Sequence, residues 1–90
     1  MAELVGEVCG DATDALAKLE RALHGGNRLL VSCAKLVRVD FAAAGSILNW
    51  VASRQQDGCQ VQFRDVQRLV AVFFNVIGIT EHAKVIARTH

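Results

Sequence analysis

Proline is absent from this chain of 90 residues, and no low-complexity segment interrupts it. A chain of this length forms a single domain, and nothing in the sequence marks an internal linker. No run of about 18 or more apolar residues occurs, which excludes a typical membrane-spanning helix. The opening residues, MAELVGEV, lack the positive start and long apolar stretch of a secretory signal. We therefore expect a cytoplasmic protein.

Residues that carry chemistry are equally sparse. The formal net charge is +1 and the basic residues are scattered, which does not match the charge distribution of a nucleic-acid-binding protein. There is no C-x-x-C pair, no metal-ligand spacing among the histidines and no glycine-rich phosphate loop. Nor is there a nucleophile–base pair or a cluster of carboxylates. We expect a protein that is not an enzyme and holds no cofactor. The three cysteines are interpreted as buried, reduced thiols: Cys9, Cys33 and Cys59.

Short β-like runs alternate with helical patterns along the chain. Strands are predicted at residues 3–8, 28–33, 59–63 and near 84–88, and helices at residues 12–24, 42–56 and 66–77. Residues 34–39 are predicted to form a loop, and the apolar run at 28–33 is predicted to lie inside the sheet.

The order of these elements predicts an α/β fold. Short strands joined by helical crossovers imply parallel neighbours. Polar side chains alternate with apolar ones at 3–8 and 59–63, so one face of each strand should contact water. We therefore expect a small, mainly parallel sheet of about four strands with three to four helices, most of them covering one face.

The third predicted helix has more apolar residues than one buried face needs. Asp65 is predicted to cap it. A helical wheel groups six apolar residues into one inward stripe: Val66, Leu69, Val70, Phe73, Val76 and Ile77. Val72 and Phe74 flank this stripe. Either the helix is deeply buried, or Val72 and Phe74 form a homodimer or partner surface.

The start of the second helix is unusually bare of functional groups. Asp40 is placed to cap it, since a carboxylate there accepts from backbone N–H groups of the first turn. The next positions, residues 42–45, are three alanines and a glycine. They permit close approach of another chain, or tight packing against the sheet. Trp50 is predicted on the flank of this helix, where it either fills a groove between helices or anchors a partner.

Three segments in order resemble a STAS domain, the module of bacterial anti-sigma factor antagonists and sulfate-transporter tails. GEVCGDATDALAKLERAL is similar to the family's GELD…L…L opening. RLLVSCAKLVRVDFAAAGSIL resembles its apolar strand, aspartate and helix start, with Asp40 at the aspartate. VQRLVAVFFNVIGI resembles its closing V…LL…TGL segment, with Gly78 and Ile79 matching. The resemblance covers residues 4 to about 88 and implies a STAS-like fold.

The sequence differs from the family motif at the start of the second predicted helix. Without gaps, the motif's first Ser/Thr falls on Phe41, the next small residue on Ala42 and the glycine on Ala43. A register that matches Gly45 instead places alanines at the hydroxyl positions. In the family, a partner kinase phosphorylates that hydroxyl, and the added charge disrupts docking. We therefore expect no phosphorylation switch; the nearest substitute is Ser46, one helical turn on.

STAS domains usually open with an additional strand that pairs with the one predicted at residues 3–8. We therefore expect residues 1–90 to be a single STAS-like domain that lacks the family's first strand. The missing segment would be absent, supplied elsewhere, or part of a longer parent protein.

The resemblance implies a non-enzymatic module that docks a protein through the loop and N-terminus of the second helix. The residues expected to bind are Asp40, Phe41, Ala42, Ala43, Ser46, Asn49 and Trp50. One partner class is an anti-sigma kinase, which this protein would antagonise. The alternative is the ATPase of a phospholipid-transport ABC system, with this protein as its accessory STAS subunit. A third hypothesis is a regulatory domain that docks in cis within a longer protein. None involves nucleic acid or membrane insertion.

Overall fold

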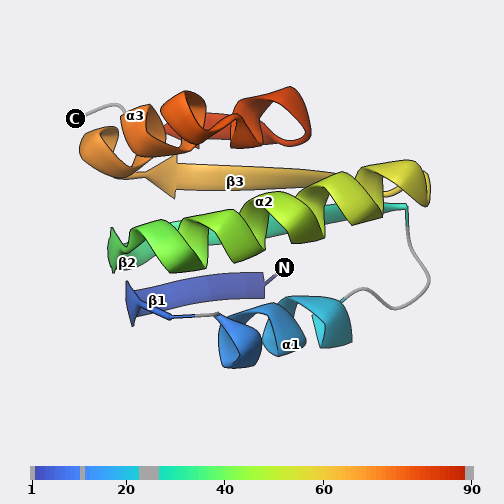
Figure 1. The fold of residues 1–90 in the computed structure, drawn as a ribbon, viewed down its shortest axis with the longest axis horizontal. Helices are drawn as coiled ribbons and strands as arrows, with labels where there is room; N and C mark the ends of the chain where they lie inside the picture. Colours follow the sequence, from blue (N-terminus) through green and yellow to red (C-terminus); the bar gives the residue numbers. More distant parts are fainter. Residues whose placement is uncertain (1, 11, 23–26, 89–90) are drawn as a thin grey trace.

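The computed structural model describes residues 2–10, 12–22 and 27–88 (Figure 1). The elements follow in the order β1 (Ala2–Val8), α1 (Thr13–Ala22), β2 (Arg28–Val39), α2 (Phe41–Gln56), β3 (Gln60–Val66), α3 (Arg68–Ile77), a 3-10 turn η1 (Ile79–Glu81) and β4 (Lys84–Ala87). The predicted alternation of strands and helices is confirmed. The last two positions of the predicted helix at 12–24 lie outside the described residues.

The four strands form one sheet in the order β1-β2-β3-β4, and each neighbouring pair is parallel. Helical crossovers between consecutive strands place each new strand beside the previous one. β2 pairs with β1 on one side and with β3 on the other, so its predicted internal position is confirmed. The sheet is the predicted small, parallel α/β sheet.

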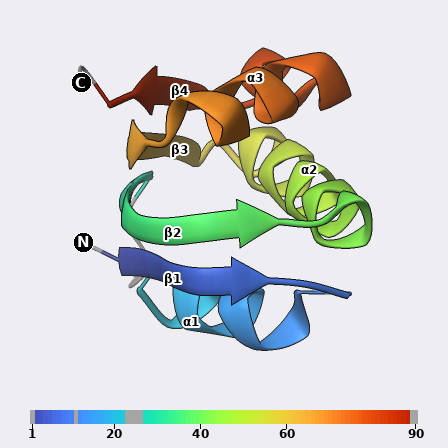
Figure 2. The ribbon, with the colours of Figure 1, turned by 90° about the vertical axis from the view of Figure 1, so that its left-hand side faces the viewer.

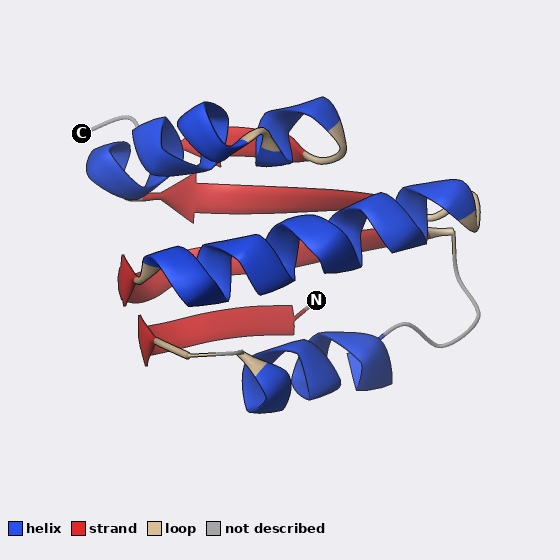
Figure 3. Cartoon of the chain, in the orientation of Figure 1, coloured by secondary structure: helices blue, strands red, loops and turns tan. Residues whose placement is uncertain are grey.

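The three helices lie on one side of the sheet (Figures 2 and 3). β3 shows the consequence for side chains: Val61 and Phe63 are buried beneath the helices, whereas Gln60 and Arg64 are exposed on the opposite face. A sheet with one open face needs this alternation, because its outer side chains contact water. The polar positions of the predicted strands indicated this arrangement correctly.

Residues 34–39 were predicted as a loop, and this prediction is wrong. They continue β2, which extends over twelve residues. Pairing with β1 shifts register twice, between Glu3 and Val5 and between Gly6 and Glu7. Such irregularities rotate side chains away from strict alternation. Buried positions in this part of β2 are therefore three residues apart, at Cys33, Leu36 and Val39, and the period of two that identifies a strand is absent.

The third helix begins two residues later than predicted. Val66 is a fully buried residue at the end of β3, and α3 starts at Arg68. Asp65 is not its cap, because it lies in β3 with a positive φ of 57°. The N-cap position is Gln67, whose side chain makes no capping hydrogen bond. The helix ends where expected, at Gly78, whose φ of 104° is the left-handed conformation that favours glycine.

The buried face of α3 was predicted correctly only in part: Val70 is buried as expected, whereas Leu69 and Val76 are exposed. Val70 and Phe74 are the buried residues, and Phe74 packs edge-on against Phe63 with ring centroids 5.6 Å apart. Phe74 is therefore a core residue and is not available to a homodimer surface. The exposed apolar side chains of this helix are Leu69, Val72 and Val76. Because α3 lies at one edge of the fold (Figure 1), only one of its faces meets the sheet.

Candidate functional site

Asp40 fixes the junction between the ends of β1 and β2 and the start of α2. Its Oδ1 accepts a hydrogen bond of 2.8 Å from the backbone N–H of Ala43, as an N-cap does. Its Oδ2 accepts one of 3.1 Å from the N–H of Gly10, just after β1. Its own N–H donates to the carbonyl of Val8. The predicted capping role is therefore present, and the same carboxylate also ties down the end of β1.

These contacts also determine the ionisation of Asp40. The N–H groups of Ala43 and Gly10 hold the pKa of its carboxyl below the usual value, and contacts with Cys9 and Arg38 lower it further. Both carboxylate oxygens are thus occupied by groups of this chain. We assign Asp40 the role of shaping the tip of α2.

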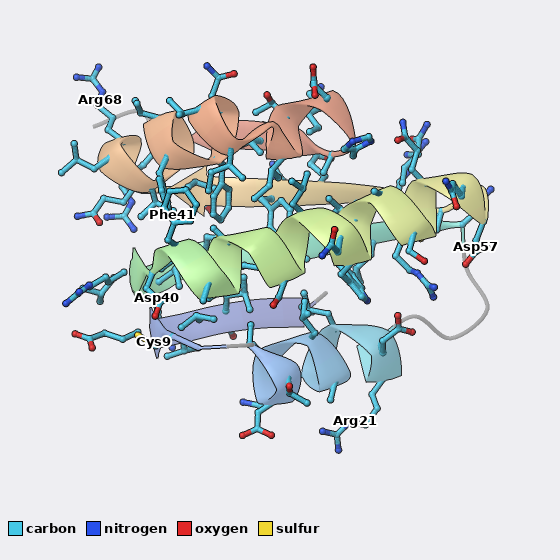
Figure 4. All side chains as sticks on the ribbon, in the orientation of Figure 1. Cys9, Arg21, Asp40, Phe41, Asp57 and Arg68 are labelled. Atoms are coloured by element: carbon cyan, nitrogen blue, oxygen red, sulfur yellow. The ribbon has the colours of Figure 1, made fainter. Side chains whose placement is uncertain are left out.

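Cys9 lies beside Asp40 at this end of the sheet (Figure 4). It was predicted to be buried, but it is exposed, because β1 ends one residue earlier. Cys33 and Cys59 are buried as predicted, and all three are free thiols. Burial raises the pKa of the Cys33 thiol to about 12.

The first turn of α2 separates the predicted docking residues into two groups. Phe41 has 77% of its surface exposed, and Ala42 is also exposed. Ala43, in contrast, is completely buried against the sheet and cannot touch a partner. The Phe41 ring packs edge-on against Phe73 of α3, with centroids 5.8 Å apart. The exposed ring is therefore held in place by its contact with α3.

Further along α2, Ser46 is half-buried and Asn49 is exposed. Ala42, Ser46 and Asn49 are spaced four and three residues apart, so they share one helical face. Together with Phe41 they form what we call the tip surface: Phe41, Ala42, Ser46 and Asn49. Its side chains are apolar, small or neutral.

Trp50 lies away from the tip surface. It is only 9% exposed, and its Nε1 donates a hydrogen bond of 2.6 Å to Oε1 of Glu20 in α1. Arg54 pairs with the same carboxylate at 3.1 Å. Trp50 thus fills the space between α1 and α2, which is the first of the two roles predicted for it. A partner cannot reach it without separating these helices.

Sequence reasoning missed an apolar groove beside the tip surface. We define the apolar groove by its hydrophobic lining, Val37, Val39, Leu69, Val70 and Phe73; Arg38 and Gln67 also line it. Its volume is about 290 Å³. The surplus of apolar residues in the third predicted helix was the available signal. The error was to assign Leu69 to the core, whereas 79% of its surface is exposed.

These features offer contact surface and little reactive chemistry. Among the described residues, no three potential metal ligands lie together. Phe41 to Gly45 carry no side-chain hydroxyl, so the first turn offers no phosphate acceptor. In the described part of the chain, no helix has the length and hydropathy needed to cross a bilayer.

Comparison with models of protein families identifies a match. A family model described as "Mlab, STAS domain" matches residues 2–87, nearly the whole chain. Searches of curated proteins and of solved structures returned no match.

Proposed function

Because the chain belongs to the STAS domain family, we propose that it is a non-enzymatic interaction module that docks a protein partner through the tip surface. The observation that carries this proposal is the 77% exposure of Phe41 at the first position of α2. A large aromatic side chain on the surface loses much unfavourable contact with water when a partner covers it. Its contact with Phe73 orients the ring before binding, which reduces the entropy lost on docking.

We propose further that docking here is not controlled by phosphorylation. The family's switch is a hydroxyl in the first turn, and residues 41–45 read Phe-Ala-Ala-Ala-Gly. Ser46 is half-buried and lies beyond that turn. A binding surface without a phosphate acceptor stays in one charge state, so its affinity would not respond to a kinase.

One candidate partner is an anti-sigma kinase, which this protein would antagonise in the cytoplasm. The alternative is the ATPase of a phospholipid-transport ABC system, for which this protein would be the accessory STAS subunit. Both classes would use the same tip surface. A third possibility is that the chain is a regulatory domain that docks in cis within a longer protein.

The test is capture of partners from native cell extract, with and without detergent, read by mass spectrometry. The informative variant is Ala42→Asp, which puts a charge on the tip surface at an exposed position. Ala43→Asp is unsuitable, because it would bury a carboxylate and unfold the chain. Ala17→Asp, at an exposed alanine of α1, is the matched control.

We expect the partner to be lost with Ala42→Asp and retained with Ala17→Asp. A recovered serine kinase supports the antagonist function, and a recovered ABC ATPase supports the transport function. Equal capture by both variants would contradict docking through the tip surface. Recovery of no partner by the unmodified chain would favour the cis-acting domain.

A further inference from the structure

We propose that the apolar groove receives an amphipathic helix of the partner, and that this helix carries acidic side chains beside its apolar face. The proposal rests on the proposed docking function and adds the chemistry of the docked segment. Three features of the described residues support it: the shape of the groove, the stripe along α3, and the positive charge of Arg38 and Arg68.

The groove lies between the end of β2 and the start of α3. Its floor is formed by the buried side chains of Val39 and Val70, and its walls by Val37, Leu69 and Phe73. Its volume of about 290 Å³ is at the lower end of the roughly 300–1,000 Å³ typical of binding pockets. Such a groove holds one or two large apolar side chains and is suited to anchors projecting from a larger partner.

The exposed side chains of α3 indicate that the partner segment is a helix. Leu69, Val72 and Val76 are 79%, 60% and 76% exposed, and they are three and four residues apart. They therefore form one stripe over two helical turns. This is the spacing that a second helix matches with its own apolar residues when two helices pack together. The stripe begins at Leu69 in the groove wall, so the two features are continuous.

The charge at the start of this stripe is positive. Arg38 lines the groove, and Arg68, the first residue of α3, projects outward from the helix (Figure 4). In the described part of the chain, Arg54 is the one arginine that forms ion pairs. Arg38 is less free, because it lies close enough to Asp40 to lower the pKa of that carboxyl and has Glu7 as its register partner in β1. Arg68 can therefore pair with a carboxylate from outside the chain, and Arg38 adds positive charge to the groove lining.

The N-terminus of α3 adds to this preference for acidic groups. Gln67 provides no capping hydrogen bond, and the first turn contains no acidic residue. The positive end of the helix dipole is thus not compensated by a side chain of its own helix. A second copy of this chain would bring the same two arginines to the groove, whereas an acidic helix complements them. For this reason we assign the groove to a different protein.

The test uses two synthetic helical peptides of about 18 residues, long enough to span the stripe. Both carry leucines at i, i+3, i+4 and i+7; one has glutamates beside this face, and the other has lysines. Each is titrated into the isotope-labelled 90-residue chain and followed by amide chemical shifts. We expect the glutamate peptide to perturb residues 37–41 and 67–76 and to bind about tenfold more tightly than the lysine peptide.

Two sets of variants make the test specific. Leu69→Asp should abolish binding of the glutamate peptide, whereas Ala17→Asp on α1 should not. The double variant Arg38→Glu with Arg68→Glu should reverse the preference between the peptides. Native-like dispersion of the amide spectrum verifies that each variant is folded. The proposal is overturned by equal affinity for the two peptides, by binding of neither, by shifts confined to the open sheet face, or by self-association that Leu69→Asp abolishes.

A final comparison separates this proposal from the proposed function. In the capture experiment, loss of the partner with Ala42→Asp and its retention with Leu69→Asp would overturn the groove proposal alone. Loss with both variants supports both proposals. Retention with Ala42→Asp would overturn docking through the tip surface, whatever the peptides show.

Discussion

The carboxylate of Asp40 connects the start of α2 to the end of β1. The ionisation state of this carboxylate should therefore affect the thermal stability of the protein. Its backbone hydrogen bonds hold its pKa below the ordinary value of 3.8. A carboxyl group with a lowered pKa stabilises the fold above the unfolded-state pKa, and this contribution is lost as the pH falls through the folded-state pKa. Asp40→Asn should therefore lower Tm at neutral pH, and its difference from the unmodified chain should shrink between about pH 5 and pH 2.

Thermal unfolding followed by circular dichroism over this pH range measures the effect. Glu3→Gln is the control, because Glu3 is an exposed carboxylate near the start of β1, away from the N-terminus of α2. A Tm difference for Asp40→Asn that stays constant with pH would contradict the assignment.

Trp50 belongs to the packing between α1 and α2, and its replacement should affect stability before binding. Trp50→Ala removes a ring that is 9% exposed and the hydrogen bond to Glu20, so unfolding should become easier by about 3 kcal/mol or more. Trp50→Phe should cost less, since it keeps most of the packing. Because this is the only tryptophan, urea unfolding is best followed by circular dichroism. A stable Trp50→Ala variant that no longer captures its partner would instead identify a binding anchor.

At the scale of the helix, α3 has one face in the core and one face in solvent. Phe74→Ala should destabilise the fold by about 3–5 kcal/mol, since this ring is fully buried against Phe63. Val72→Thr should change stability by no more than about 0.5 kcal/mol, because Val72 is 60% exposed. Urea unfolding of both variants checks the assignment. Comparable losses of stability in the two variants would contradict the burial of Phe74 and the exposure of Val72.

Sequence patterns predicted the elements well where each pattern had one interpretation. The alternation at 59–63 identified β3, and the position of Gly78 identified the end of α3. The continuation of β2 through residues 34–39 was missed because its buried residues are spaced by three. That spacing results from irregular pairing with β1, which depends on a distant segment of the chain.

The candidate site was harder to predict because it depends on which face of each helix meets the sheet. A helical wheel of α3 contains too many apolar residues to select one face, so Leu69 was placed inside and Phe74 on the flank, with burial and a partner surface both left open. Ala43 and Trp50 illustrate the same limit on α2: the sequence gives their angles on the helix, but not the neighbours that cover them. Glu20, the partner of Trp50, is thirty residues away.

At the scale of the whole molecule, the cysteines can report separately on the surface and on global unfolding. Cys9 is exposed, whereas Cys33 is completely buried in β2 and its thiol pKa is raised to about 12. The thiolate is the reactive form, so alkylation near pH 8 should modify Cys9 quickly and Cys33 only when the sheet opens. Mass spectrometry of timed samples measures the order. Labelling of Cys33 as fast as Cys9 would contradict the burial described here.

The strand order β1-β2-β3-β4 follows the order of the chain itself. As the chain emerges from the ribosome, each new strand finds the edge of its neighbour already available. The apolar groove requires both the end of β2 and the first turns of α3, and Phe41 is oriented by Phe73. A nascent chain would therefore acquire the complete proposed docking surface only after α3 has been synthesised, so a partner that needs both parts of this surface would bind only chains in which α3 has packed.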